Sequence, residues 1–219
     1  VFGQGFDLND KKARIKSISS ANEDYDSIIN SLNSEFNENT GTSLESINRI
    51  HYFIIPNELN RKIETIDELN GLLEGIRNPL SEAINYNTYG GNLANSRFSN
   101  GEKWLYSTIM HSNGIVEFRR SQRWAEIFAS SSETQKLIAI LNFANEFFKK
   151  INYFGVYRLG IDIGNLGRYG FHDTFFNNRG IYEHSLGKLR KFIELDSPLV
   201  QEQSKINLKI LELIKIVGG

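Results

Sequence analysis

The stretch that decides the fold is 104–120, WLYSTIMHSNGIVEFRR. Two runs of β-forming residues flank Asn113-Gly114, and an Asn-Gly pair between such runs is a strong local signal for a β-hairpin. A two-residue loop at this pair would set Met110 opposite Glu117 and point Phe118 toward the core. The sequence therefore predicts an antiparallel strand pair that forms part of a larger sheet.

The two arginines that end this stretch, Arg119 and Arg120, occupy neighbouring positions of one strand. Successive side chains of a strand point to opposite faces of its sheet. We therefore expect the two arginines to lie on opposite faces, where they cannot form one clamp for an anion. The face with the apolar side chains is expected to carry Leu105, Ile109, Val116 and Phe118, with Ser107, His111 and Arg120 nearer its margins, and the opposite face Trp104, Tyr106, Met110, Glu117 and Arg119.

Further strands are predicted on both sides of this pair. Residues 47–55, INRIHYFII, are β-branched and aromatic on both faces, which is typical of a strand buried on both sides and closed here by Pro56. Residues 153–163 predict a strand whose core face carries tyrosine, leucine and isoleucine, with Arg158 and Asp162 on the other face. A short strand is expected at 189–195.

Capping boxes predict the helices. The pattern of a serine or threonine followed three residues later by glutamate favours a helix start, and it occurs at 20–23, 65–68 and 130–133. Apolar residues then recur with helical spacing, as they do in the first helix at Tyr25, Ile28, Ile29, Leu32 and Phe36. A last helix is expected over 198–217, where an exposed apolar stripe would instead indicate an oligomerisation module.

Three segments lack a regular pattern. Residues 1–18 are polar and read as a flexible arm, and 164–187 are rich in glycine and aromatic residues. Residues 85–103, NYNTYGGNLANSRFSNGEK, are the most loop-like part of the chain. A loop of this length is uncommon in a compact domain and often functional, so it is either a flap that binds a partner or a plain excursion.

Composition supports one globular domain. The chain has 219 residues, of which 40% are hydrophobic and 23% charged, enough for a buried core. The sequence predicts a single α+β domain over 1–219, with a mixed or antiparallel sheet covered by amphipathic helices. Because Val1 is not a start methionine, we expect a piece of a longer protein.

Cellular location and sulfur chemistry are also constrained. The absence of cysteine excludes disulfides, thiolate nucleophiles and cysteine zinc sites, and it fits a reducing cytoplasm. Residues 1–5 lack the basic and apolar regions of a signal peptide, and no apolar run is long enough to span a bilayer. We expect a cytoplasmic protein with no cofactor and no metal, since no histidine pair has ligand spacing.

Charge is distributed unevenly along the chain. Residues 1–100 carry 9 basic and 14 acidic side chains, whereas 101–219 carry 16 and 12. Within 149–191 there are 8 basic and 3 acidic residues. A patch that binds nucleic acid weakly would fit this region, as would an ordinary solvated surface.

Aromatic and basic residues interleave in the same region, an arrangement that can stack bases and hold phosphates. It is equally an arrangement of core aromatics beside surface charges. The sequence predicts a contact surface for a protein domain or nucleic acid in this region together with 85–103. Its candidate contact residues are Arg119, Arg158, Arg168, Tyr169 and Arg179.

A rival hypothesis is a nuclease or other phosphodiesterase-type hydrolase. Histidine beside a carboxylate can act as a general acid or base, and the candidate catalytic residues are His172, Asp173, Arg179 and His184. The spacing of Arg179 and His184, R-x4-H, also resembles the short motif of the HEPN ribonucleases. Those enzymes are all-helical, which the strands expected here do not fit. The hypothesis requires the four side chains to converge on one pocket.

One stretch resembles a known family. The block WLYSTIMHSNGIVEFRRSQRWAEIF (104–128), followed by a long apolar helix and FGVYRLGIDI, resembles the region after the ATP-binding-like domain of bacterial Schlafen/AlbA-type proteins. The resemblance covers about 95–165. The matching positions are Trp104, Asn113, Gly114, Ile115, Val116, Glu117 and Phe118.

The functional features of that family lie in a domain that this sequence lacks, so no functional residue carries over. The resemblance implies an accessory or sensing domain of a bacterial cytoplasmic protein that acts in phage defence or gene regulation. We therefore expect a non-enzymatic interaction domain, with homo-oligomerisation and DNA binding among its possible modes.

Overall fold

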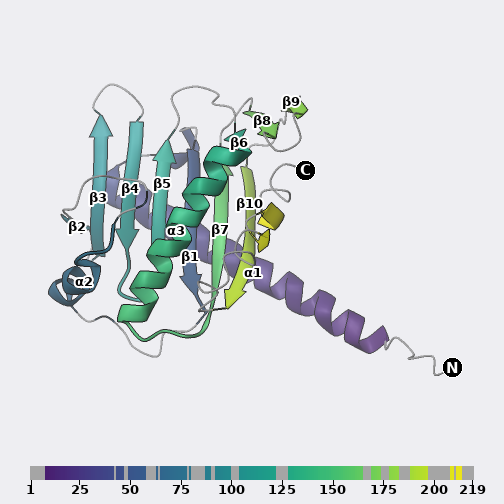
Figure 1. The fold of residues 1–219 in the computed structure, drawn as a ribbon, viewed down its shortest axis with the longest axis horizontal. Helices are drawn as coiled ribbons and strands as arrows, with labels where there is room; N and C mark the ends of the chain where they lie inside the picture. The colour runs from purple at the N-terminus through teal and green to yellow at the C-terminus, as the bar shows by residue number, and fades with distance from the viewer. Residues whose placement is uncertain are drawn as a thin grey trace. The chain divides into compact units, whose positions relative to one another are not determined.

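The computed structural model describes residues 8–41, 43–46, 49–57, 63, 65–77, 79, 87–89, 92–99, 104–121, 128–164, 169–173, 178–182, 188–196, 208–209 and 211–213. The chain divides into two units, Val1–Leu44 and Glu45–Gly219. Figure 1 shows the elements of both units.

The first unit is built on the helix α1, Leu8–Thr40. No glycine or proline interrupts this range, so the helix begins well before residue 20, where the sequence predicted its start. Residues 8–18, expected in an arm, are therefore helical, and residues 1–7 lie outside the described residues. Gly41 follows the helix with a φ of 64°, a conformation that glycine adopts readily at a helix C-terminus. The predicted inner face is confirmed by the burial of Tyr25, Ile29, Leu32 and Phe36.

The second unit contains a seven-stranded sheet in the order β10-β7-β1-β5-β4-β3-β2, in which every neighbouring pair is antiparallel. Its strands are β1 (Arg49–Pro56), β2 (Asn87–Tyr89), β3 (Asn92–Ser99), β4 (Trp104–Met110), β5 (Val116–Ser121), β7 (Val156–Gly164) and β10 (Lys188–Asp196). The strand β1 lies in the middle of this order and is buried along its whole length, as predicted. The α+β class expected from the sequence is confirmed.

The predicted two-residue loop between β4 and β5 is wrong. The His111 N–H donates to the Ile115 carbonyl (2.9 Å) and the Gly114 N–H donates to the His111 carbonyl (2.8 Å), so the chain turns through three residues. Gly114 has a φ of 80°, which suits the left-handed position that ends a three-residue loop. The extra residue places Met110 opposite Val116 instead of Glu117.

This shift changes the predicted faces of β4 and leaves those of β5 intact. Met110 joins the core with Val116 and Phe118, while Ile109 pairs with Glu117 on the other face. Arg119 and Arg120 do lie on opposite faces, as expected: Arg119 contacts Glu117 of its own strand, whereas Arg120 contacts Glu133 of α3.

Helices cover the apolar face of the sheet. The helix α2 (Ile66–Leu73) begins at the predicted capping box, where the Glu68 N–H donates to the Thr65 hydroxyl (3.1 Å). The helix α3 (Ser130–Lys150) begins at the third box and runs diagonally across the sheet (Figure 1). The core between helices and strands includes Leu69, Leu73, Leu137, Phe143, Phe147, Phe148, Tyr52, Phe118, Leu159 and Ile161.

Two segments predicted to be irregular contain strands. The range 85–103 contains β2 and β3, because pairing with β4 supplies the hydrogen bonds that its composition did not indicate. The range 164–187 contains β8 (Tyr169–Asp173) and β9 (Asn178–Tyr182). With β6 (Phe128–Ala129) they form a second sheet in the order β6-β8-β9, in which β6 and β8 run parallel.

The last predicted helix is described at 208–209 and 211–213, where it is helical. Leu213 is buried in the core of the second unit, whereas Leu208 is 67% exposed. The described part of this helix therefore packs on the unit through Leu213. The remaining residues that would decide between a packed helix and an exposed apolar stripe lie outside the described residues.

Candidate functional site

A row of polar residues crosses the face of the sheet opposite α3. Backbone pairing aligns them at directly opposite positions of five neighbouring strands. In the order of the strands from β10 to β4, the row consists of Arg190, Asp162, His51, Arg119 and Ser107. We refer to these five residues as the polar row. It arises because each of the five strands places a polar residue at the same level of this face, where the side chains are buried.

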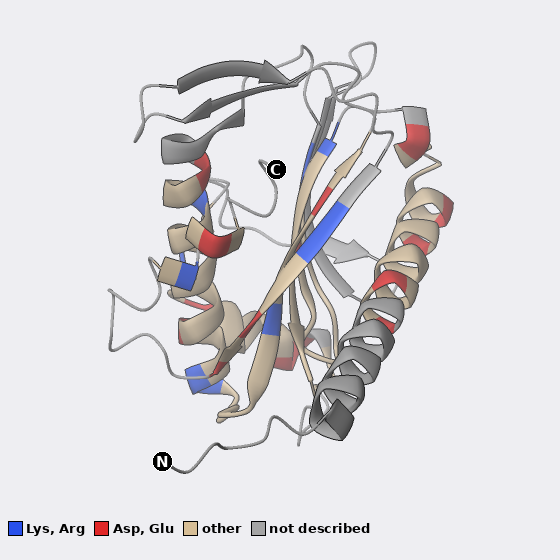
Figure 2. Cartoon of the chain, turned by 90° about the vertical axis from the view of Figure 1, so that its right-hand side faces the viewer, with Lys and Arg blue, Asp and Glu red and all other residues tan. Residues whose placement is uncertain are grey.

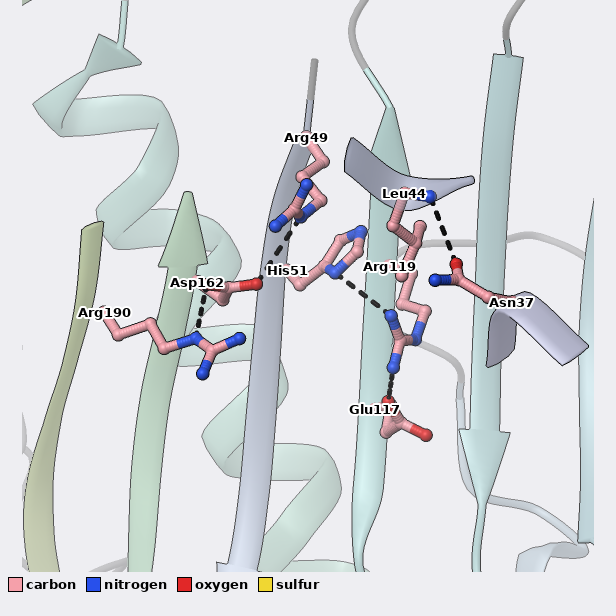
Figure 3. A network of polar contacts seen from close by, with 8 residues as sticks. All are labelled: Asn37, Leu44, Arg49, His51, Glu117, Arg119, Asp162 and Arg190. Atoms are coloured by element: carbon pink, nitrogen blue, oxygen red, sulfur yellow. Dashed lines mark hydrogen bonds and ion pairs between the residues drawn. The ribbon is translucent and has the colours of Figure 1, made fainter. Parts of the chain in front are cut away.

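Asp162 holds one end of the polar row together. The Arg190 Nε donates to Asp162 Oδ1 (2.8 Å), and the Arg49 Nε donates to Oδ2 (3.5 Å). All three side chains are at least nine-tenths buried. Figure 3 shows both guanidinium groups pointing at this carboxylate from the strands on either side. The carboxylate thus joins β10, β7 and β1.

Arg49 needs the glycine that faces it. Gly164 lies directly opposite Arg49 on β7. A Cβ at Gly164 would lie 2.6 Å from both terminal nitrogens of Arg49, so a side chain there would displace the guanidinium. Glycine at this position provides the space in which Arg49 can reach Asp162.

Glu117 organises the other end. Arg119 donates to Glu117 through one terminal nitrogen and contacts His51 Nδ1 (3.3 Å) through the other. His111 Nε2 lies 2.5 Å from the second oxygen of Glu117. Burial alone would raise the pKa of Glu117, but the charge of Arg119 and the hydrogen bonds from His111 and Arg119 outweigh it and lower that pKa. Glu117 is therefore ionised at neutral pH.

His51 is neutral in this environment. Burial, followed by the charges of Arg119, Arg49 and Arg190, holds its pKa well below the ordinary value. Because Arg119 can only donate, His51 Nδ1 is the acceptor and the single ring proton lies on Nε2. Among the described residues, His51 Nε2 has no hydrogen-bond partner, and neither has the Ser107 hydroxyl at the end of the row.

A second polar group attaches α3 to the apolar face of the sheet. The Tyr52 hydroxyl donates to Glu133 in the first turn of the helix. Lys136 (2.6 Å) and Arg120 (3.3 Å) donate to the other oxygen of the same carboxylate. Burial and the neighbouring Glu133 raise the pKa of Tyr52 well above its ordinary value, so it remains a donor.

The polar row has limited catalytic capacity. Its carboxylate, Asp162, and the adjacent Glu117 already accept hydrogen bonds from guanidinium groups, and its histidine has lost the tendency to take up a proton near neutral pH. Charges paired in this way across neighbouring strands fix strand register. The arrangement is suited to holding the sheet rigid.

The edge of the sheet carries a different set of charges. The strand β10 is the last in the strand order, and Arg158 of β7 reaches across to it. Arg158 Nε lies 3.4 Å from Glu194 Oε1, and its guanidinium lies 5.4 Å from the centre of the Phe192 ring. The Glu194 side chain is 51% exposed and that of Arg158 is 13% exposed. Of the predicted contact surface, the structure describes Arg158 and its neighbours Glu194 and Phe192 at this edge of the sheet.

The predicted contact residues separate in the structure. Arg119 is completely buried in the polar row, where Glu117 and His51 engage it, so it belongs to the interior and not to a contact surface. Arg158 lies at the edge described above. Tyr169 is on β8 and Arg179 is on β9, with side chains that are not described, and Arg168 lies outside the described residues.

The predicted catalytic residues are brought together in part. His172 of β8 pairs directly with Arg179 of β9, and Asp173 pairs with Asn178. The backbone therefore places His172 and Arg179 at opposite positions of one strand pair. His184 lies outside the described residues, and the side chains of the other three are not described.

The residues of the polar row were not predicted as a set from the sequence. One signal was present, namely the arginine and histidine that alternate with apolar residues in RIHYFII (49–55) of a strand predicted to be buried on both faces. Buried charges require partners, so this pattern indicates that counter-charges from other parts of the chain lie beside this strand. The partners themselves depend on strand order, which the local sequence does not specify.

Comparison of the chain with protein-family models, with curated proteins and with solved structures finds no match. Within the described residues, no group of three or more histidine, aspartate or glutamate side chains could hold a metal ion. In that same part of the chain, no helix combines the length and apolarity needed to cross a membrane.

Proposed function

We propose that the chain is a non-enzymatic interaction domain of a bacterial cytoplasmic protein that acts in phage defence or gene regulation. Its binding element is the edge strand β10, Lys188–Asp196, and its partner is a protein segment that adds a strand to the sheet. The observation that carries the proposal is the position of this nine-residue strand at the end of the strand order.

Edge strands are natural docking elements because their outer backbone groups can pair with another strand. The two ends of the sheet differ in this respect. The strand β2 has three residues, whereas β10 has nine and spans about 30 Å at roughly 3.3 Å per residue. Of the two end strands that the structure describes, β10 is the one long enough for an added strand to pair extensively.

The sheet also presents β10 in a fixed position. Arg190 and Asp162 join β10 to β7 through a buried ion pair, and Arg158 and Glu194 join them again four residues further along β10. A pre-organised strand loses little conformational entropy when a partner binds. The charges behind β10 therefore favour binding without making contact with the partner backbone.

Nucleic acid is the other partner class that the sequence indicated. The described arginines of the expected surface are already engaged, Arg119 by Glu117 and Arg158 by Glu194. Phosphate binding would have to replace these carboxylates, which favours a protein partner. Titration with DNA and RNA at low salt tests this directly, since binding to phosphates would weaken steeply as salt is added.

A library of unstructured peptides, selected for binding to the chain, tests the docking edge. A strand that pairs antiparallel with β10 meets basic residues near its C-terminus and acidic residues near its N-terminus. We expect enrichment of peptides with basic residues in the first half and acidic residues in the second. Enrichment without this charge order, or binding that survives reversal of the β10 charges, would contradict the proposal.

A second candidate function is hydrolysis of a phosphodiester by His172, Asp173, Arg179 and His184. It is supported by the pairing of His172 with Arg179, which places a proton-transferring residue opposite a phosphate-binding one. Incubation with single-stranded and double-stranded DNA and RNA should then release products, and His172→Ala and Arg179→Ala should each abolish the release. Cleavage that both variants retain would eliminate this candidate.

A further inference from the structure

The charges of β10 are ordered along the strand. Its sequence is KLRKFIELD, with Lys188, Arg190 and Lys191 before the central Phe192 and with Glu194 and Asp196 after it. Figure 2 looks onto this edge of the sheet, where basic residues are followed along the front strand by acidic ones. The basic half and the acidic half make β10 complementary to a second β10 that runs in the opposite direction.

We propose that two copies of the chain form a dimer by antiparallel pairing of their β10 strands about a two-fold axis at Phe192. This inference rests on the proposed role of β10 as the docking edge and names its partner, which is a second copy of the same chain. The two seven-stranded sheets would join into one continuous sheet.

Symmetry fixes which positions meet in this dimer. In a two-fold antiparallel pair, each residue faces the residue at the same distance on the other side of the centre. Residues equally distant from Phe192 lie on the same face of the sheet, so the faces of the two sheets agree. The facing positions are Lys188 with Asp196, Leu189 with Leu195, Arg190 with Glu194, and Phe192 with its own copy.

Neighbouring registers are less favourable. A centre at Lys191 would place this lysine opposite its own copy, which is repulsive. A centre at Ile193 would still face Arg190 with Asp196, but it would remove Lys188 from the paired region and set Glu194 against Phe192. Of these three registers, the one centred on Phe192 pairs both acidic residues of β10 with a basic residue.

The polar row would continue through this interface. Within one copy, Arg190 lies opposite Asp162, and Glu194 lies opposite Arg158. In the dimer, Arg190 would lie between Asp162 of its own chain and Glu194 of the second copy. Charged residues on an edge strand ordinarily prevent pairing with other strands. Here they would repel most strands and accept the identical one.

The mass of the 219-residue chain in solution gives the first test. At about 100 μM, where even a weak dimer is populated, light scattering after size exclusion should give twice the 25.1 kDa of one chain. Asp196→Lys would put lysine opposite Lys188 and should weaken dimerisation about tenfold or more. Asp196 is exposed, so this change leaves the core intact.

A charge exchange gives the decisive test. In Lys188→Glu/Asp196→Lys the two ends of the strand swap charge, and the facing positions become complementary again. Restored dimerisation supports the pairing, because residues 188 and 196 of one strand are about 26 Å apart and cannot contact each other. A double variant as weakly dimeric as Asp196→Lys, or wild-type chain that stays monomeric, would overturn the inference.

A labelled peptide of residues 188–196 separates failure of the dimer from failure of the docking edge. If the chain is monomeric but binds this peptide, the second copy is not the partner while β10 remains a docking edge. If the chain is monomeric and binds neither this peptide nor any selected peptide, both proposals fail.

Discussion

Arg49 and Arg190 bind opposite oxygens of one buried carboxylate, that of Asp162, although they belong to strands that are not neighbours in the sheet. Asp162 lies on β7 between them, and its carboxylate links a side chain of β1 to a side chain of β10. Two positive charges therefore share this one carboxylate inside the protein.

Asp162→Asn should be strongly destabilising. It would remove the negative charge that both buried guanidinium groups contact, and breaking a buried ion pair in this way costs about 3–5 kcal/mol. The triple variant Arg49→Met/Asp162→Leu/Arg190→Met removes all three charges and should lose less stability than the single variant. Urea unfolding measures both. A triple variant that is less stable than Asp162→Asn would contradict this account.

His51 should make the folded state sensitive to mild acid. Its pKa is lowered in the folded protein by burial and by Arg119, Arg49 and Arg190. Below pH ~6.5 the unfolded chain binds a proton that the folded chain does not, so stability falls by about 1.4 kcal/mol per pH unit from this residue alone. His51→Gln cannot titrate, and its unfolding free energy between pH 7 and pH 5 should fall less steeply. Parallel slopes for the two proteins would exclude this role.

Glu117 should affect stability at lower pH than His51 does, and it stabilises the fold in its charged form, whereas His51 does so in its neutral form. Its folded pKa is lowered, so the stability that it contributes is complete above the unfolded value of about 4.3 and is lost as the pH falls through the folded value. Glu117→Gln should be less stable at pH 7, where Arg119 and His111 lose an ionised acceptor. As the pH falls through the lowered folded pKa of Glu117, the stability of the wild type should approach that of the variant. Acid unfolding followed by circular dichroism tests whether the two curves converge.

Two glycines should respond in opposite ways to alanine. Gly114 has a φ of 80°, where a side chain is strained, so Gly114→Ala should cost about 1 kcal/mol. Gly71 lies in α2 with nothing near its Cβ position, and Gly71→Ala should gain about 0.5–1 kcal/mol through helix propensity. Thermal unfolding of both variants provides the comparison. A stabilising Gly114→Ala would contradict the three-residue loop.

The contact between Tyr52 and Glu133 should contribute modestly. Tyr52→Phe removes the hydroxyl donor but leaves Glu133 with Lys136 and Arg120, so the expected loss is about 1 kcal/mol. Glu133→Ala should cost more, because it leaves the buried Tyr52 hydroxyl without its acceptor and separates both cations from their carboxylate. Equal losses for the two variants would show that Tyr52 does not need this acceptor.

Local patterns in the sequence were sufficient for much of the fold. The strand β1, the starts of α2 and α3, and the alternation of Arg158 and Asp162 with apolar residues in β7 were all predicted correctly. Each depends on residues near one another in the chain, where side-chain period and helix capping act directly. The separation of Arg119 from Arg120 was predicted for the same reason.

The errors occurred where contacts between distant parts of the chain determine the structure, and at one turn where the local pattern allows two loop lengths. The asparagine-rich segment of β3 has no alternating pattern, and its strand forms because β4 lies beside it. The hairpin register was wrong by one residue because both two- and three-residue loops accept glycine after asparagine. The polar row could not be predicted, since Arg49 and Asp162 are 113 residues apart and meet only through strand order.

The central place of β1 in the sheet also determines when the second unit can fold during synthesis. This strand is synthesised before both of its neighbours, β5 and β7, and must be enclosed by them afterwards. A nascent chain that has emerged only to the end of α3 holds Arg49 and His51 beside an unfilled position, without Asp162. Completion of the sheet therefore waits until β7 leaves the ribosome, and the second unit is expected to acquire its stability late, in a single step near the end of translation.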